Sequence, residues 1–191
     1  MKDLITRVEE YVKECSKENE PGHDFSHILR VRKMALELAD IVECDSLLVN
    51  LLALLHDVED HKAAKKNKIS DFLHGIDIKE ELKEKILYII PFLSFSKYPS
   101  LSNDFPIEGK IVSDADRLDA IGAIGIARAF SYGGANKREM YGSDNSTIRH
   151  FDEKLLKLDQ YLYLDKSKEI AKKRMKVLKE FYDEFISEIN N

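Results

Sequence analysis

The sequence predicts an all-α fold built as one domain. Apolar residues recur every three or four positions through most of the 191 residues, which is the spacing of one helix face. Glycine (8) and proline (4) are scarce, and this composition favours helix over strand. A short hairpin between Tyr132 and Thr147 is the only strand-like alternative. We therefore expect one domain over residues 1–191, with a core at about 22–134 and C-terminal helices at about 147–190 packed on it.

The first half of the chain predicts a central apolar helix among amphipathic ones. A helix over about residues 2–17 should end at the Glu-Pro-Gly segment, residues 20–22. The next helix should begin near Asp24 or Ser26, both of which are good N-caps. Residues 46–58 are apolar nearly all round, interrupted only by Asn50, so this helix belongs at the centre of the fold. Two shorter helices should follow within residues 67–95, and a loop within 96–106.

The second half predicts further helices separated by polar segments. We expect helices at about residues 107–119 and 121–132, with Gly133 and Gly134 ending the second of them. Residues 137–145 should form a polar loop. Two long amphipathic helices, at about residues 147–164 and 167–190, should then close the chain.

Charge and composition restrict the partners and the location. A net charge of −5 argues against a nonspecific nucleic-acid binder, which needs a basic surface to replace condensed counterions. The two cysteines form no CxxC motif, which favours a reducing compartment. The richest apolar run, residues 47–55, is too short to span a membrane and is broken by Asn50. We expect a cytoplasmic protein with no nucleic-acid or membrane partner, either a monomer or a homodimer.

Histidine and aspartate residues at helix positions predict a metal site. His27 lies at the edge of an apolar helical stripe, and the His56-Asp57 pair ends the central apolar helix. Buried polar groups of this kind must be hydrogen bonded or bind a metal ion. Together with an aspartate far downstream, they make a mixed nitrogen and oxygen donor set. This set suits divalent transition metals better than calcium or a structural thiolate zinc site.

Three segments carry a resemblance to a known family. The segments HDFSHILRV (residues 23–31), LLHD (54–57) and SDADRLDAIGAIGIAR (113–128) resemble the H...HD...D signature of the HD-domain superfamily. The long third segment is more similar to a bacterial subfamily of small single-domain HD hydrolases, and the resemblance covers about residues 22–188. It implies an all-α HD-domain helical bundle with one divalent metal ion, manganese foremost, with Fe, Co, Ni, Zn or Mg as alternatives. The ligands implied by matching position are His27, His56, Asp57 and Asp116. Asp114 is the alternative to Asp116.

The subfamily resemblance implies a phosphohydrolase, and most specifically the hydrolysis of nucleoside triphosphates to monophosphate and pyrophosphate by a metal-bound water. The candidates for proton transfer and charge stabilisation next to the metal pair are Asp60, Glu59 and Lys62, with Asp60 favoured as the general base. The candidate substrate contacts are His23, Lys110, Arg117, Arg128, His150 and Lys154. For each of these side chains the alternative is a structural ion pair or a solvated surface position. Tyr132, Phe95 and Tyr141 could supply a stacking face for the base.

Other functions remain open at this point. Within the enzyme class, the alternatives are a phosphodiesterase and a (p)ppGpp-type hydrolase. A non-catalytic metal or nucleotide sensor could use the same pocket. All four signature residues are present, which argues against this hypothesis, because degenerate sensors often lose them. A purely structural helical protein would leave two histidines and two aspartates among apolar helices without an explanation.

Overall fold

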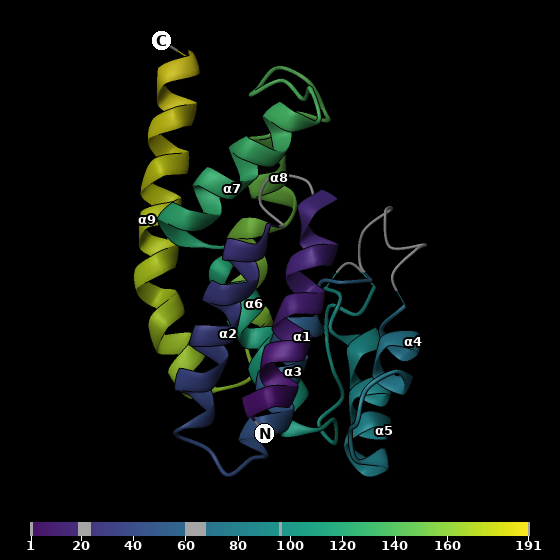
Figure 1. The fold of residues 1–191 in the computed structure, drawn as a ribbon. Helices are drawn as coiled ribbons and strands as arrows, with labels where there is room; N and C mark the ends of the chain where they lie inside the picture. The colour runs from purple at the N-terminus through teal and green to yellow at the C-terminus, as the bar shows by residue number, and fades with distance from the viewer. Residues whose placement is uncertain (1, 19–23, 60–67, 96, 191) are drawn as a thin grey trace. The chain divides into compact units, whose positions relative to one another are not determined.

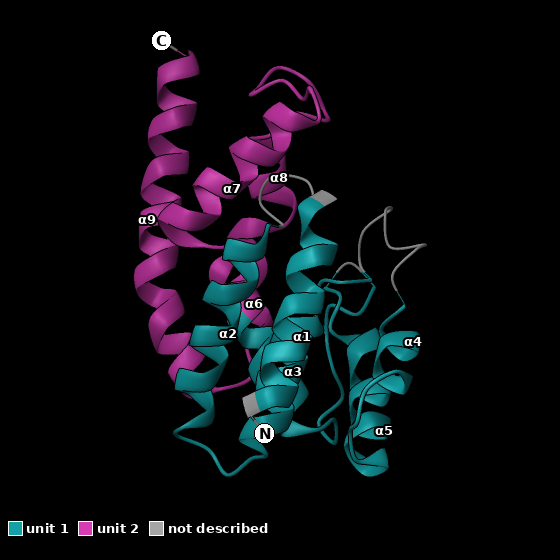
Figure 2. Cartoon of the chain, viewed as in Figure 1, with its two compact units in different colours: residues 1–19, 23–115 teal, residues 20–22, 116–191 magenta. Residues whose placement is uncertain are grey.

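The computed structural model describes residues 2–18, 24–59, 68–95 and 97–190. Within these ranges the chain forms helices and turns and no strand, which confirms the predicted all-α fold. Residues divide into two compact units, one of residues 1–19 and 23–115 and the other of residues 20–22 and 116–191 (Figure 2). Helix α6 (Ile107–Asp119) belongs to both units. In the described ranges, no helix combines the length and the apolar character needed to cross a membrane.

Unit 1 is organised around α3 (Ser46–Leu55). Its other helices are α1 (Lys2–Cys15), α2 (Phe25–Ala39), α4 (Ile69–His74) and α5 (Glu80–Ile89), with 3₁₀ turns η1 (Ser16–Glu18) and η3 (Ile90–Phe92). Helices α1, α2 and α5 each pack against α3, and α4 packs against α5 (Figure 1). Every residue from Leu48 to Leu55 is buried. The helix that is apolar all round is therefore the core of its unit, as the sequence predicted.

Polar side chains fix the beginning and the middle of α3. The carboxylate of Asp45 caps the helix by accepting hydrogen bonds from the backbone N–H groups of Leu47 (3.0 Å) and Leu48 (3.1 Å). Asn50, the one polar interruption, is buried, and its Oδ1 accepts a hydrogen bond from Arg32 Nε of α2 at 2.7 Å. Arg32 also pairs with Glu9 of α1 at 2.7 Å. One guanidinium therefore links three helices and satisfies a polar group in the core.

Unit 2 is organised around the long helix α9 (Asp165–Asn190). Its other helices are α7 (Gly122–Ala135), α8 (Arg149–Glu153) and the 3₁₀ segment η4 (Leu155–Tyr161). Helix α7 and η4 both pack against α9. The core between them is rich in aromatic rings, because Phe130 of α7 contacts Phe151, Phe181 and Phe185 with ring centroids 5.8–5.9 Å apart.

The turn between α6 and α7 requires glycine at its first helical position. Gly122 has a φ of +74°, which side-chain-bearing residues rarely adopt. A Cβ at this position would also lie 3.0 Å from Cβ of Arg174. The guanidinium of Arg174 donates to the carbonyl of Leu118 in the last turn of α6. A cation on α9 thereby caps the carboxyl end of α6.

The prediction of one long helix over residues 147–164 is wrong. A short α8 ends at Glu153, and Lys154 has a non-helical backbone (φ −132°, ψ −59°). The chain continues as a 3₁₀ helix, in which residues three apart share a face. Leu155 and Leu158 have this spacing, and both are buried. Both leucines therefore lie on the buried face of the 3₁₀ segment.

The prediction that Gly133 and Gly134 end their helix is also wrong, because α7 continues to Ala135. Gly133 serves a close contact instead, since a Cβ there would collide with Oγ1 of Thr147. The alternative of a hairpin beyond it is not seen in the described residues. Two backbone hydrogen bonds instead join the two ends of this segment, from Thr147 N to Glu139 O (2.8 Å) and from Ile148 N to Met140 O (3.0 Å).

Replacing Arg32 by leucine should lower the free energy of unfolding by about 1–3 kcal/mol, because it leaves the buried Asn50 amide without this partner. The matched control is Arg7→Leu on α1, whose pair with Asp3 is exposed, and its cost should be at most about 0.5 kcal/mol. Urea unfolding followed by circular dichroism measures both. Equal costs for the two variants would contradict the role assigned to Arg32.

Candidate metal centre

His27 is placed by the cap of α2. The Asp24 carboxylate accepts hydrogen bonds from the backbone N–H of His27 (2.9 Å) and from the Ser26 hydroxyl (2.6 Å). Burial alone would raise the pKa of Asp24, but these hydrogen bonds outweigh it and hold the pKa below its usual value. Asp24 therefore remains an effective cap near neutral pH. The His27 side chain, in the first turn of the helix, is only 1% exposed.

His56 and Asp57 lie where α3 ends. His56 is the C-cap residue of the helix, and Asp57 follows it with 4% of its surface exposed. His56 Nδ1 lies 2.8 Å from the carbonyl oxygen of Ala53. A carbonyl oxygen can only accept, so Nδ1 carries the proton and donates it to this bond. The hydrogen bond fixes the tautomer and leaves Nε2 as the ring nitrogen that can bind a cation.

The structure brings three of the predicted ligands together. His27, His56 and Asp57 each offer a ligand atom, and these three atoms all lie within 4.8 Å of one another. The two imidazole rings approach edge to face, with their centroids 5.4 Å apart. Two imidazoles and a carboxylate at this spacing fit a divalent transition metal, for which nitrogen and oxygen ligands of this kind are typical.

The fourth predicted ligand, Asp116, lies on α6 within unit 2 and is half-buried. The alternative, Asp114, is on the same helix within unit 1 and is completely buried. Helical periodicity places Asp114 with the buried face of Ile111 and Leu118. The choice of Asp116 therefore rests on the resemblance of its motif and stays a prediction.

Among the predicted catalytic residues, the structure describes Glu59. Its Oε1 accepts a hydrogen bond from the backbone N–H of Ile69 at 2.7 Å, at the first residue of α4. Glu59 therefore caps a helix that has no side-chain cap of its own from Lys68. Asp60 and Lys62, together with the predicted substrate contact His23, lie outside the described residues.

Three other predicted substrate contacts have structural partners. Lys110 Nζ donates to the carbonyl of Asn103 at 2.5 Å. Arg117 donates to the carbonyl of Tyr161 at 2.6 Å, and its guanidinium lies 5.2 Å from the centre of the Tyr163 ring. Arg128 pairs with Asp119 at 3.0 Å, and both side chains are largely buried. These contacts favour the structural alternative, while the substrate role stays a prediction.

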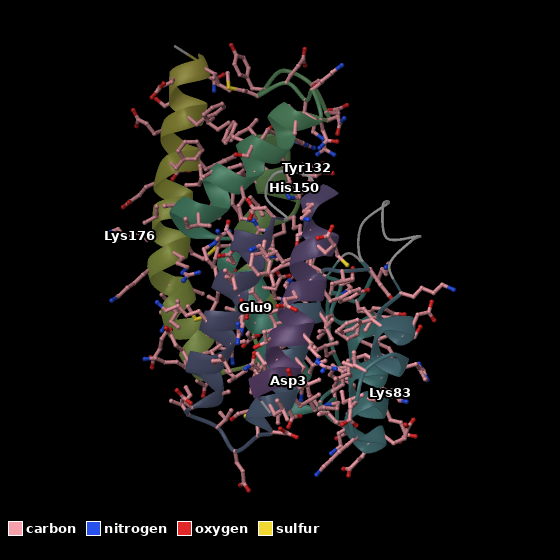
Figure 3. The ribbon with its side chains drawn as sticks, viewed as in Figure 1. Asp3, Glu9, Lys83, Tyr132, His150 and Lys176 are labelled. Carbon is pink, nitrogen blue, oxygen red and sulfur yellow. The ribbon has the colours of Figure 1, made fainter. Side chains whose placement is uncertain are left out.

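The last two predicted contacts, His150 and Lys154, lie in unit 2, where the charges of Lys154 and Arg138 both act on His150. His150 is half-buried on α8 (labelled in Figure 3), and the backbone N–H of Lys154 bonds its carbonyl at 3.1 Å. Burial first, and then the nearby charges of Lys154 and Arg138, lower the pKa of His150 from 6.5 to about 4, while Glu153 acts in the opposite direction. Arg138 also lies over the Tyr132 ring at 5.2 Å. Sequence reasoning missed Arg138, because a single arginine in a polar loop gives no periodic or motif signal.

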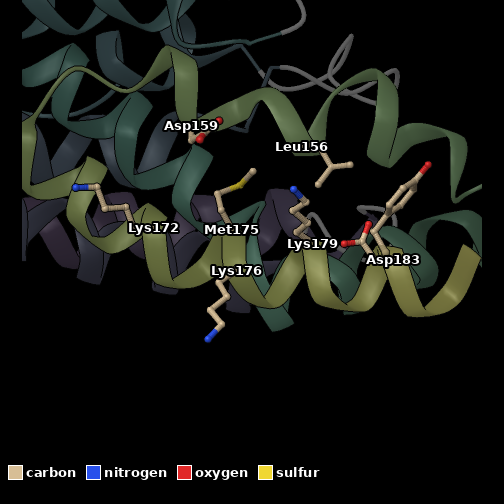
Figure 4. Close-up of a pocket in the computed structure, with 8 residues that line it drawn as sticks. Leu156, Asp159, Lys172, Met175, Lys176, Lys179 and Asp183 are labelled. Atoms are coloured by element: carbon tan, nitrogen blue, oxygen red, sulfur yellow. The ribbon is translucent and has the colours of Figure 1, made fainter. Parts of the chain in front are cut away.

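Two hollows among the described residues can be compared with the candidate centre. One, of about 210 Å³, opens next to His56 in unit 1; its lining residues are His56, Glu59, Ile90, Pro91, Ser94, Lys97 and Tyr98. The other, of about 500 Å³, lies between η4 and α9 in unit 2 (Figure 4), and lysine and aspartate side chains line much of it. None of the predicted site residues lines the larger hollow. The smaller one is therefore the cavity that belongs to the candidate centre.

Both the sequence and the fold are similar to those of known proteins. The sequence model of the HD domain matches residues 24–121. YpgQ of Bacillus subtilis is 34% identical over 189 residues, which cover 95% of this chain and 92% of YpgQ. The crystal structure of B. subtilis YpgQ in complex with ADP matches with a TM-score of 0.82 at 32% identity, covering 97% of both chains. An HD-superfamily hydrolase from Bacillus thuringiensis matches with a TM-score of 0.76 at 37% identity, covering 99% of this chain and 98% of the other.

The lowered pKa of His150 predicts a pH-dependent stability. Between about pH 6.5 and pH 4 the unfolded imidazole is protonated while the folded one is not, so the folded state loses stability as the pH falls through this window. The His150→Gln variant should lose less stability than the wild type between about pH 7 and about pH 5. Urea unfolding at the two pH values measures the difference. The same pH slope for both proteins would contradict the prediction.

Proposed function

The chain belongs to the HD-domain family, and we therefore propose that it is a metal-dependent phosphohydrolase that acts on nucleotides. The observation that carries the proposal is the cluster of His27, His56 and Asp57, whose ligand atoms lie within 4.8 Å of one another. Two of these side chains are almost completely buried. Two imidazoles and a carboxylate at this spacing are typical ligands of a divalent transition metal, which supports the proposal.

The donor set supports one divalent cation held by His27, His56, Asp57 and Asp116, with manganese as the first choice. When bound, the cation would make water a usable nucleophile near neutral pH and would offset the negative charge of the phosphates. His56 would present Nε2, because its Nδ1 proton is held by the Ala53 carbonyl. The place of Asp116 in this set rests on the similarity of its motif to the family signature.

A nucleotide is supported as the substrate class by a relative. B. subtilis YpgQ, which is similar over nearly the whole chain, has been crystallised in complex with ADP. We propose that nucleoside triphosphates are cleaved between the α- and β-phosphates, giving a monophosphate and pyrophosphate. Positioning and charge neutralisation supply most of the catalysis in such reactions.

Other side chains would transfer protons and bind the phosphates. Asp60 is our choice for the general base, with Glu59 as the alternative, and Lys62 would stabilise charge on the phosphates. His150, Lys154 and Arg138 lie close enough together for the two cations to lower the pKa of the imidazole. We propose that this cluster binds phosphate oxygens. His23, Lys110, Arg117 and Arg128 are weaker candidates, and the last three have structural partners.

Purified protein with Mn²⁺ should release pyrophosphate, rather than single phosphates, from at least one nucleoside triphosphate. The His56→Ala/Asp57→Ala double variant should lose at least about 100-fold of this rate, because even the loss of groups behind the ligands costs 10–100-fold in metal sites. The matched control is His74→Ala/Asp77→Ala, which removes an exposed histidine and an exposed aspartate from the same unit. It should retain the activity. If protein that binds Mn²⁺ hydrolyses none of the nucleotides, the proposed function is contradicted.

Mn²⁺ binding should also raise the melting temperature, since a ligand that binds only the folded state stabilises it by mass action. The rise should be absent in the His56→Ala/Asp57→Ala variant and intact in the His74→Ala/Asp77→Ala control. Differential scanning calorimetry with and without Mn²⁺ measures the shift. A shift of the same size in the double variant would place the cation elsewhere.

A further inference from the structure

The cavity beside His56 adjoins the metal cluster. His56 is a member of the metal cluster and also lines this cavity of about 210 Å³. A ligand group in the cavity would therefore adjoin a phosphate bound at the cluster. Pockets for whole drug-sized ligands measure roughly 300–1,000 Å³, so this cavity suits only one part of a nucleotide.

One wall of the cavity is an aromatic ring held by other rings. Tyr98 contacts Phe92 with ring centroids 4.9 Å apart, and Phe92 contacts Phe105 at 5.5 Å. Tyr88 completes the row, 6.2 Å from Phe105. Tyr98 nevertheless remains 40% exposed. A ring that is packed on one side and accessible on another is a preorganised surface for stacking.

The backbone around Tyr98 fixes this ring in place. The N–H of Tyr98 bonds the carbonyl of Ser94 at 2.9 Å, and the N–H of Leu93 bonds the carbonyl of Ile90 at 3.1 Å. The second bond closes the 3₁₀ turn η3, whose Ile90 and Pro91 supply the apolar part of the lining. The first bond belongs to a turn that follows η3, so backbone hydrogen bonds and the contact with Phe92 together support the stacking surface.

The polar lining suits a neutral group with hydroxyls. Glu59 and Ser94 face the same cavity, and the cap that Glu59 forms on Ile69 fixes the position of its carboxylate. Acidic side chains are common acceptors for ribose hydroxyls in nucleotide sites. Among the described residues that line the cavity, Lys97 is the one lysine or arginine and Glu59 the one carboxylate. This balance gives little net attraction for a polyphosphate chain, which carries several negative charges.

We propose that the cavity is the nucleoside subsite, in which the base stacks on Tyr98 and the sugar hydroxyls bond to Glu59 and Ser94. The inference rests on the proposed function, because it assigns the nucleoside end of the same substrate. It makes the substrate class a nucleotide rather than an inorganic polyphosphate. It also makes Tyr98 a residue that determines specificity.

The test compares two probes that differ in the nucleoside. Isothermal titration calorimetry in Mn²⁺ gives the Kd of α,β-methylene-ATP and of inorganic tripolyphosphate for wild-type protein and for Tyr98→Leu. The variant should bind the nucleotide analogue about 10-fold more weakly, within the range found for loss of one base-stacking ring. It should bind tripolyphosphate as tightly as the wild type does.

Two further variants serve as controls. Tyr88→Leu removes a more exposed ring from the same aromatic row, away from the cavity, and should change neither Kd. Lys97→Met tests the rival occupant, because a phosphate chain in the cavity would make tripolyphosphate binding depend on this cation. Circular dichroism and the melting temperature establish that each variant is folded.

The outcomes separate the two proposals. If Tyr98→Leu leaves the analogue's Kd unchanged or weakens both probes equally, the subsite is wrong. Selective loss of tripolyphosphate binding in Lys97→Met would overturn it in favour of the phosphate chain. Wild-type protein that binds the analogue through Tyr98 but hydrolyses no nucleotide would support the subsite and overturn the proposed function alone.

Discussion

The burial of two imidazoles and a carboxylate at the end of the most apolar helix is the constraint on which the rest of the candidate centre depends. His27 and Asp57 are almost inaccessible to solvent, and the helix leading to His56 is fully buried from Leu48 to Leu55. Water cannot solvate such groups well, so their burial must be offset by interactions inside the protein. In the proposed function a divalent cation is one of these interactions, and the apolar core holds its three clustered ligands in place.

This arrangement demands that α2 and α3 hold a fixed register, and polar contacts act together with apolar packing to fix it. Asp24 sets the first turn of α2 and with it the position of His27. Arg32, two turns further along, donates to Asn50 in the middle of α3. Leucine contacts tolerate small sliding movements, whereas a hydrogen bond to a buried amide loses its geometry within a few tenths of an ångström. The hydrogen bond that helps to position α2 against α3 therefore explains why Asn50 interrupts an otherwise apolar helix.

Sequence predicted those parts of the fold and site whose cause is local. Periodicity located α2, α3 and α9, and the HD-type motif led to His27, His56 and Asp57, which the fold brings together. The change from α-helix to 3₁₀ helix within residues 147–164 was not predicted, because residues three apart share a face in both helix types and apolar spacing does not separate them. The cavity beside His56 was not predicted from the sequence either. Tyr98 lies in a loop between two prolines, and its role follows from contacts with Phe92 that no sequence spacing reveals.

The charged residues of the segment 113–128 show why a motif does not by itself assign roles. Arg128 is held by Asp119, and Arg117 by the Tyr161 carbonyl, so much of the positive charge in this part of the chain is already engaged in the fold. His150 behaves differently. Burial first, and then the charges of Lys154 and Arg138, lower the pKa of its imidazole, so the ring is neutral near neutral pH. A neutral imidazole can still donate one hydrogen bond to a phosphate oxygen, while Lys154 and Arg138 would supply the positive charge. The proposed phosphate contacts of unit 2 therefore combine one neutral donor with two cations, a combination that no motif in the sequence marks.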